Sequence, residues 1–337
     1  MTIDNQSGAT PFGNCRPTRR SIVLASLLAP LALPARAETA WPSKPITYVV
    51  PYPPGGTTDI LGRTIAQGLT QTLGVSVIVE NKPGATGTIG GGFVARAEPD
   101  GYTLLGTSIG PQTIVPHLMK LPYDAAKAYE PIILVGTVPH LLAVKGDSPY
   151  NSVQDLIAAA KANPGAVSFA SGGLGTILQI QGELLRLQTD TKMLHVPYKG
   201  DVPAMQDVMS GQVTFVFIPV SAALTQVQAG KLKALAATSA KRLPELQQTP
   251  TMAELGFKDF VVEQWQAIYA PAKTPAQIVQ RLNEAINQIL KAPDVVARFG
   301  KAGVTIVGGT PEDLAQRQAA DYERWRGVIK AADIKIE

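Results

Sequence analysis

Short apolar runs alternate with longer amphipathic segments along most of this chain, and that alternation most constrains its fold. Residues 46–50 form an apolar run typical of a buried strand, and residues 58–73 have apolar side chains at helical spacing. The same pair recurs at 167–170 and 177–187. Strands that alternate with helices of this length predict a parallel sheet in an α/β architecture.

The rest of the chain continues this pattern without repeats or a long polar linker. Two lobes joined by more than one chain crossing explain the missing linker, with candidate crossings at 141–144 and 268–271. We therefore expect one lobe from residues 41–143 with 268–337, and a second from 144–267. Further strands are expected at 75–80, 103–107, 132–135, 141–144, 195–198, 213–218 and 234–238, and a further helix at 153–161.

The N-terminal segment has the three parts of an export signal. Arg19 and Arg20 precede an apolar run at 22–33, and small residues flank Arg36. The run is shorter than the roughly 20 residues that a membrane-spanning helix needs. We expect residues 1–37 to be cleaved after Ala37. The arginine pair resembles a twin-arginine signal, but the usual Phe and Lys after it are absent, so the export route stays open.

Cysteine use and charge narrow the possible functions. Cys15, the only cysteine, precedes the apolar run, which is the wrong order for lipid attachment, so the mature chain has no thiol or disulfide. A nucleic-acid partner is not expected, because it needs a basic patch and the mature charges are mixed. Removing the signal lowers the formal charge from +4 to +1, because its charged residues, net +3, are Asp4, Arg16, Arg19, Arg20 and Arg36.

A loop of prolines and glycines links the first expected strand to the first helix. Residues 50–59 read Val-Pro-Tyr-Pro-Pro-Gly-Gly-Thr-Thr-Asp. Gly55 and Gly56 let the backbone approach a ligand with free N–H groups, and a helix N-terminus favours negative charge. This first loop is therefore a candidate anion site. The alternative is a stiff turn in which Thr58 or Asp59 only caps the helix.

A second glycine loop stands in the equivalent place of the other expected lobe. Residues 171–176, Ser-Gly-Gly-Leu-Gly-Thr, follow a strand and open a helix. Such a turn is either structural or a second helix N-terminus directed at the same ligand. Two loops of this kind in two lobes suit a small molecule with two carboxylates.

A third glycine-rich segment, residues 84–95, contains a G-x-G-x-x-A match at Gly90, Gly92 and Ala95. A dinucleotide fingerprint begins immediately after its strand, whereas nine residues separate Glu80 from Gly90. We interpret these residues as packing a helix closely against the sheet, and we expect no cofactor.

Catalytic constellations are poor throughout the sequence. His117, His140 and His195 lack metal-binding spacing, and no phosphate-loop motif occurs. We expect no catalytic residue and no metal. The alternative is an exported α/β hydrolase with Ser171 or Ser108 as nucleophile, which would need His195 within about 3 Å of one of these serines.

Nine short segments, spread in order through nearly the whole mature chain, carry a family pattern. They are WPSKPI at 41–46, VPYPPGG at 50–56 with Asp59, VENKPGA at 79–85, PDGYTLL at 99–105, LPYD at 121–124, HVPYKG at 195–200, GKLKALA at 230–236, PTMAE at 250–254 and APAKTP at 270–275. Together they resemble the Bug-type extracytoplasmic solute-binding receptors associated with tripartite tricarboxylate transporters.

The resemblance implies a two-lobed periplasmic-binding-protein fold, type II-like, that closes on a small mono- or dicarboxylate. It implies a periplasmic monomer that works with membrane transporter subunits. A ligand sensor for a membrane signalling protein is an alternative. The ligand-binding residues that it implies are Tyr52, Pro54, Gly55, Gly56 and Asp59 in the first loop, Ser171, Gly172 and Thr176 in the second, and Ser108 and Tyr198.

One departure from the family pattern leaves the ligand open. A histidine often follows the Gly-Thr pair of the second loop in the family, whereas Ile177, Leu178 and Gln179 follow Thr176 here.

Overall fold

The first expected strand and helix form where the apolar pattern places them. The computed structural model describes residues 41–257 and 259–335. Strand β1 (Ile46–Val50) is buried along most of its length, and helix α1 (Thr57–Leu73) follows it after the first loop. The export signal and its cleavage site lie outside the described residues. Within 41–257 and 259–335, no helix is both long and apolar enough to cross a bilayer.

One half of the sheet is built around β1. Its strands lie in the order β2–β1–β3–β9–β4, with β10 on the other edge of β4. The pairs of β1 with β2 and β3 are parallel, whereas β9 runs antiparallel to β3 and β4. These strands are β2 (Val77–Asn81), β3 (Thr103–Ser108), β4 (Tyr129–Lys145), β9 (Glu263–Pro271) and β10 (Thr305–Ile306).

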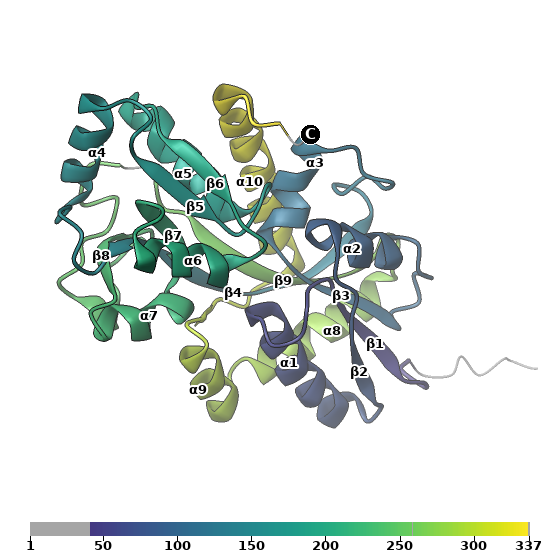
Figure 1. Cartoon of the computed structure of the whole chain (residues 1–337). Helices are drawn as coiled ribbons and strands as arrows, with labels where there is room; N and C mark the ends of the chain where they lie inside the picture. Colours follow the sequence, from purple (N-terminus) through teal and green to yellow (C-terminus); the bar gives the residue numbers. More distant parts are fainter. Residues whose placement is uncertain (1–40, 258, 336–337) are drawn as a thin grey trace, which may run out of the picture. The chain divides into compact units, whose positions relative to one another are not determined.

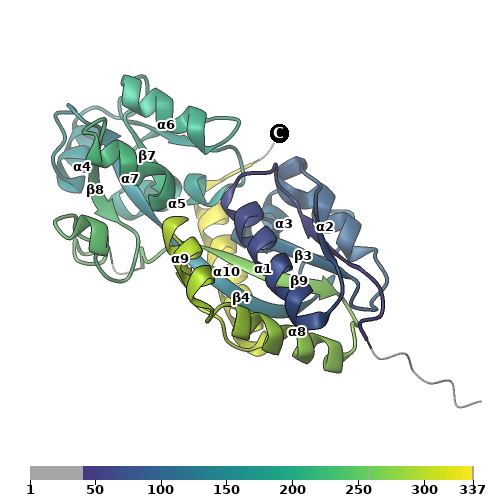
Figure 2. The ribbon, with the colours of Figure 1, turned by 90° about the horizontal axis from the view of Figure 1, so that it is seen from below.

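Helices and short helical turns complete this half of the fold. Helices α1 and α8 lie side by side (Figures 1 and 2). The helical elements here are η1 (Ala85–Gly87), α2 (Thr88–Ala95), η2 (Gly110–Ile114), α3 (Val115–Leu118), α8 (Ala276–Ile289) and α9 (Pro293–Lys301).

The other half continues from β4 in the order β4–β7–β5–β6, with β8 also paired to β4. Here β5 is parallel to β6 and β7. Helix α10 packs on both β4 and α5 (Figure 1). The elements are α4 (Val153–Ala162), β5 (Ser168–Ser171), α5 (Ile177–Thr189), β6 (Leu194–Pro197), α6 (Asp201–Ser210), β7 (Phe215–Pro219), α7 (Val220–Gln228), β8 (Leu232–Ala237), η3 (Pro244–Leu246) and α10 (Pro311–Ala332).

Strand β4 corrects two sequence-based expectations. The runs expected as separate strands at 132–135 and 141–144 belong to this one strand of 17 residues. The sheet is also mixed rather than wholly parallel, because β4 is antiparallel to β7, β8 and β9. Strand β4 pairs with β9 as far as Pro139 and with β7 from His140 onward. The residue limits of the two lobes stay a prediction.

The glycine-rich segment at 84–95 packs tightly. A Cβ atom at Gly90 would lie 2.8 Å from the Cβ of Pro51, and one at Gly91 would lie 2.7 Å from the hydroxyl of Tyr123. Only glycine lets α2 come this close to its neighbours. The helix-packing interpretation of these residues agrees with the structure.

Candidate functional site

The first loop ends in a helix N-terminus with free backbone N–H groups. Gly56 is the N-cap of α1 and supplies no side-chain cap. The first helical bond runs from the Ile60 N–H to the Gly56 carbonyl. Such groups at the positive end of a 17-residue helix can bind an anion. The N–H groups without a hydrogen bond to another described residue are those of Gly56, Thr57, Thr58 and Asp59.

The buried carboxylate of Asp59 holds this loop in shape. It accepts hydrogen bonds from the Gly55 N–H (2.9 Å), Asn81 Nδ2 (2.8 Å) and Arg63 Nε (3.0 Å). Burial opposes ionisation, but these bonds and the charge of Arg63 together hold the pKa of the Asp59 carboxyl below its usual value. Asp59 therefore positions the loop, and its direct contact with a ligand stays a prediction.

Replacing Asp59 by alanine tests this role. We expect the free energy of unfolding to fall by about 1–3 kcal/mol, because the Gly55 N–H and the Asn81 amide would each lose a hydrogen bond to a charged acceptor. Urea unfolding followed by circular dichroism measures the change. Asp147→Ala is the control, because the Asp147–Lys145 pair is exposed and worth at most about 1 kcal/mol. Equal destabilisation by the two variants would contradict the role.

Tyr52 and Ser108, both predicted from the sequence, lie together. The Tyr52 hydroxyl is 2.7 Å from Ser108 Oγ. Burial raises the pKa of Tyr52 to about 12, against the opposing effect of the hydrogen bond to Ser108 and of the nearby Thr107 hydroxyl, so the phenol keeps its proton. Ser108 lies opposite Gln266 in the β3–β9 pair, and Gln266 Oε1 accepts a hydrogen bond of 2.8 Å from Thr58 Oγ1. Gln266 is a positioning residue that the sequence did not indicate.

The backbone beside Tyr52 is strained. Four successive residues have positive φ: Gly84 (126°), Ala85 (45°), Thr86 (54°) and Gly87 (87°). This conformation costs about 1–3 kcal/mol at a residue that is not glycine, and such strain concentrates at functional sites. A Cβ atom at Gly87 would lie 3.5 Å from Cζ of Tyr52. We therefore add this turn to the candidate site. Its sequence signal is Gly-Ala-Thr-Gly at 84–87, which lies within the segment that the sequence indicates as helix packing and overlaps the family segment at 79–85.

In the second loop, Thr176 is the N-cap of α5. Its hydroxyl donates to the Gly173 carbonyl (2.8 Å) and accepts from the Gln179 N–H (3.4 Å). The Gly175 N–H donates to Gln179 Oε1 (2.8 Å). The loop is thus held by its own hydrogen bonds. The Thr176 hydroxyl already donates its hydrogen bond to the Gly173 carbonyl. A contact between Thr176 and a ligand stays a prediction.

The variant Thr176→Val separates the capping role from ligand binding. We expect a loss of about 0.5–2 kcal/mol in the free energy of unfolding, as for other lost N-caps, with little change in affinity for the folded protein. Urea unfolding and calorimetry on the same variant measure both quantities. A 10- to 150-fold weaker affinity, roughly the loss of one hydrogen bond to a charged group, would instead assign the hydroxyl to the ligand.

The second loop lies beside the segment that follows Ser108. A Cβ atom at Gly110 would stand 3.8 Å from the Gly175 carbonyl oxygen, which is ordinary van der Waals contact. The next residue, Pro111, is packed against Gly87. The structure thus brings the second loop, the end of β3 and the strained turn into one region with Tyr52.

The remaining predicted residues divide into exposed and internally bonded positions. Pro54, Gly55 and Gly56 are exposed on the first loop. The Tyr198 hydroxyl donates a hydrogen bond of 2.6 Å to Asp207 Oδ2. Desolvation, and to a smaller extent the hydrogen bond to Asp207 and its charge, raise the pKa of Tyr198 to about 12. The Tyr198 hydroxyl is therefore occupied by α6.

Ser171 and His195 form a hydrogen-bonded pair. Their Oγ and Nε2 atoms are 2.7 Å apart, which meets the distance condition set for a hydrolase. The Ser171 side chain, however, is fully buried, and its hydroxyl also bonds to Gly173. Burial lowers the pKa of His195 to about 4, so its ring is neutral. No carboxylate is hydrogen-bonded to His195 among the described residues, so the orienting acid of a catalytic triad is missing.

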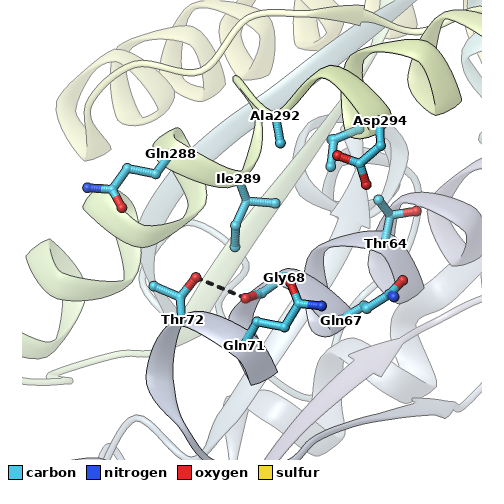
Figure 3. Close-up of a pocket in the computed structure, with 10 residues that line it drawn as sticks. Thr64, Gln67, Gly68, Gln71, Thr72, Gln288, Ile289, Ala292 and Asp294 are labelled. Carbon is cyan, nitrogen blue, oxygen red and sulfur yellow. Dashed lines mark hydrogen bonds between the residues drawn. The ribbon is translucent and has the colours of Figure 1, made fainter.

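Two other features of the described residues bear on the site. No group of His, Cys, Asp and Glu within 41–257 and 259–335 has the arrangement of a metal site. A groove of about 260 Å³ lies between α1 and the α8–α9 region (Figure 3). It is lined on α1 by Thr64, Gln67 and Gln71, beyond the first turn that carries the free N–H groups. This groove is separate from the candidate anion site.

Comparison with known proteins identifies the class. A family model described as tripartite tricarboxylate transporter family receptor matches residues 61–334. Protein BugT of Bordetella pertussis is 38% identical over 311 residues, covering 92% of this chain and 95% of BugT. The fold is the two-lobed fold of periplasmic binding proteins. The chain belongs to the tripartite tricarboxylate transporter receptor family, which is a family of periplasmic solute-binding receptors.

Solved structures agree with this assignment. The periplasmic binding protein BugD has a TM-score of 0.76 and 36% identity, with 88% of this chain and 100% of BugD covered. An R. palustris protein solved with adipate has a TM-score of 0.78 and 34% identity, with coverage of 88% and 99%. MatC from Rhodopseudomonas palustris, solved with bound malate, has a TM-score of 0.76 and 30% identity, with coverage of 86% and 100%.

Proposed function

We propose that this protein captures a small mono- or dicarboxylate in the periplasm and delivers it to the membrane subunits of a tripartite tricarboxylate-type transporter. The observation that carries the proposal is the set of four N–H groups at the start of α1 that have no hydrogen bond to another described residue. Neither glycine loop contains a lysine or arginine. Helix dipole and N–H groups, rather than a salt bridge, would therefore neutralise the carboxylate. Adipate and malate in the two related structures support this ligand class.

The energies require several contacts and lobe closure. One charge at a helix N-terminus gains about 0.3–1 kcal/mol when exposed and up to about 2 kcal/mol when partly buried. Micromolar affinity corresponds to about 8 kcal/mol. Several N–H contacts must therefore act together in a place from which water is excluded. We propose that the second loop closes over the ligand by a hinge motion of the two lobes.

Thermal-shift screening of the mature protein against a library of carboxylic acids tests the proposal. We expect saturable stabilisation by a small carboxylate, confirmed by calorimetry, and recovery of the unchanged ligand by mass spectrometry. Absence of binding across the library, or steady conversion of a ligand into product, would contradict the receptor function.

A second candidate function is an exported hydrolase, because Ser171 and His195 are hydrogen-bonded as a nucleophile and its base would be. A nucleophilic serine would be labelled by a fluorophosphonate and lose that label in Ser171→Ala. We expect no labelling of the folded wild-type protein, because the Ser171 side chain is fully buried and no carboxylate of the residues that the structure describes is bonded to His195. Labelling specific to Ser171 would support the hydrolase.

A further inference from the structure

A groove of about 570 Å³ separates the C-terminal half of helix α5 from helix α10. We call it the α5–α10 groove, and it is lined by Leu184, Gln188, Asp259, Val261, Arg324 and Val328. Among the described residues, one hydrogen bond joins the two helices directly, from Arg186 Nη2 to the Ala332 carbonyl at 3.4 Å. Movement of one helix against the other would therefore break few hydrogen bonds.

Helix α10 is bonded more firmly to the half of the sheet that contains β1. The buried Asp321 of α10 accepts a hydrogen bond of 2.9 Å from Trp265 Nε1, and Gln318 accepts one of 2.9 Å from the Tyr269 hydroxyl. Trp265 and Tyr269 both belong to β9, which pairs with β3. Helix α10 also packs on η2, which follows β3. We therefore expect α10 to move with the half that carries the first loop.

Helix α5 is fastened near its middle to both places where the chain passes between the halves of the sheet. The buried Gln181 has its Oε1 2.7 Å from His140 Nδ1, and its Nε2 donates to the Val262 carbonyl at 3.1 Å. At His140, strand β4 changes its partner from β9 to β7. Val262 directly precedes β9. Gln181 thus lies at the hinge that two lobes joined at these crossings would have.

The two ends of α5 lie on opposite sides of Gln181. Thr176, the N-cap, belongs to the second loop, and Gln188 lines the α5–α10 groove. At about 1.5 Å per residue, Thr176 lies roughly 8 Å from Gln181 along the helix axis, and Gln188 lies roughly 10 Å beyond it. A rotation that carries Thr176 toward the first loop must carry Gln188 in the opposite direction, away from α10.

We propose that α5 rotates about Gln181 when the lobes close on a ligand, so that the α5–α10 groove widens while the second loop approaches the first. This inference rests on the proposed function and adds a means of controlling it. A side chain that fills the groove favours the closed form, and a link that holds the two helices together opposes it. The alternative is that α5 and α10 move as one body and the groove stays unchanged.

Two groove-filling variants, Gln188→Trp and Val328→Trp, test the inference from either helix. Lys330→Trp is the matched control, because Lys330 is exposed on α10 and lies roughly 200° around the helix from Val328. Calorimetry uses a carboxylate found by thermal shift, and thermal unfolding shows that each variant is folded. We expect the groove-filling variants to bind about three- to tenfold more tightly than the wild type, because the closed form is more populated. The control should bind like the wild type.

A reversible link between the helices tests the opposite effect. Cys15, the only cysteine of the sequence, lies in the expected signal, so Gln188→Cys combined with Val328→Cys gives the mature protein two thiols without a competitor. A short bis-methanethiosulfonate that joins them should weaken carboxylate binding about tenfold. A reductant should then restore the affinity. Each single cysteine variant, treated in the same way, is the control.

The outcomes separate this inference from the proposed function. Groove-filling variants that bind like Lys330→Trp, or more weakly, would overturn the inference, as would a link that leaves the affinity unchanged. In either case, carboxylate binding by the wild type would leave the proposed function standing. Failure of the wild type to bind any carboxylate would refute the proposed function and the inference with it.

Discussion

Gly56→Val is expected to abolish carboxylate binding while the protein stays folded. Gly56 has φ −77° and ψ 170°, an extended conformation that valine adopts readily, and a Cβ atom there would meet no atom within 4 Å. The backbone of Gly56 does not require glycine, so the constraint at this position is space for a ligand. The neighbouring Gly55 does need a glycine backbone, because its φ is 90°. A valine side chain would cover the free N–H groups of α1. Loss of several contacts together should weaken binding by about 100-fold or more.

Calorimetry with a ligand found by thermal shift, together with circular dichroism, measures the effect. Gly327→Val in α10 is the matched control, because a Cβ atom there also meets no atom within 4 Å. The smaller variant Gly56→Ala should give an intermediate loss. If folded Gly56→Val keeps the wild-type affinity, the first loop is not the carboxylate site.

The fold class was predictable from local patterns, but the course of β4 was not. Apolar runs and helical spacing depend on neighbouring residues, so β1 and α1 could be placed from sequence. Gly136 and Pro139 interrupt the apolar pattern of β4 and make one strand look like two. The structure explains Gly136, because a Cβ atom there would lie 2.6 Å from the Thr305 carbonyl oxygen of β10. That contact joins residues far apart in sequence.

In the candidate site too, some features follow from neighbouring residues, whereas others depend on contacts between residues far apart in the sequence. Glycines next to a helix start indicated both loops. The role of Asp59 depends on Asn81, and the pairing of Ser171 with His195 depends on the β5–β6 register, in which Phe169 lies opposite His195. Backbone angles such as φ 54° at Thr86 follow from packing and have no reliable sequence signal.

Acid is expected to destabilise the protein through His140, which lies where β4 leaves β9 and pairs with β7. The His140 side chain is fully buried, and its Nδ1 lies 2.7 Å from Gln181 Oε1. Gln181, on α5, donates its amide to the Val262 carbonyl (3.1 Å), so its Oε1 is an acceptor and Nδ1 carries the proton. The Nε2 atom has no hydrogen-bond partner among the described residues. Protonation would create a buried, unpaired N–H and a buried charge.

The sign of the pH effect follows from the pKa of His140. Burial lowers this pKa from 6.5 to about 4, against the opposing effect of the hydrogen bond to Gln181 and of the nearby Gln264 side chain. Between these values the unfolded chain binds more protons than the folded protein. The stability is therefore fully present above pH 6.5 and is lost as the pH falls toward 4. At about 1.4 kcal/mol for each pH unit, His140 should contribute a loss of about 3 kcal/mol.

Urea unfolding at a series of pH values, for wild type and His140→Gln, isolates this contribution. His117 and His195, whose pKa values are also lowered, destabilise both proteins alike in acid, so the difference between the two curves reports on His140. The variant should be less stable near neutral pH, because Gln181 loses its imidazole partner, but its stability should depend less on pH. Parallel curves would show that His140 is protonated without cost in the fold. The hydrogen bonds from His140 through Gln181 to the Val262 carbonyl would then persist with a charged imidazole ring.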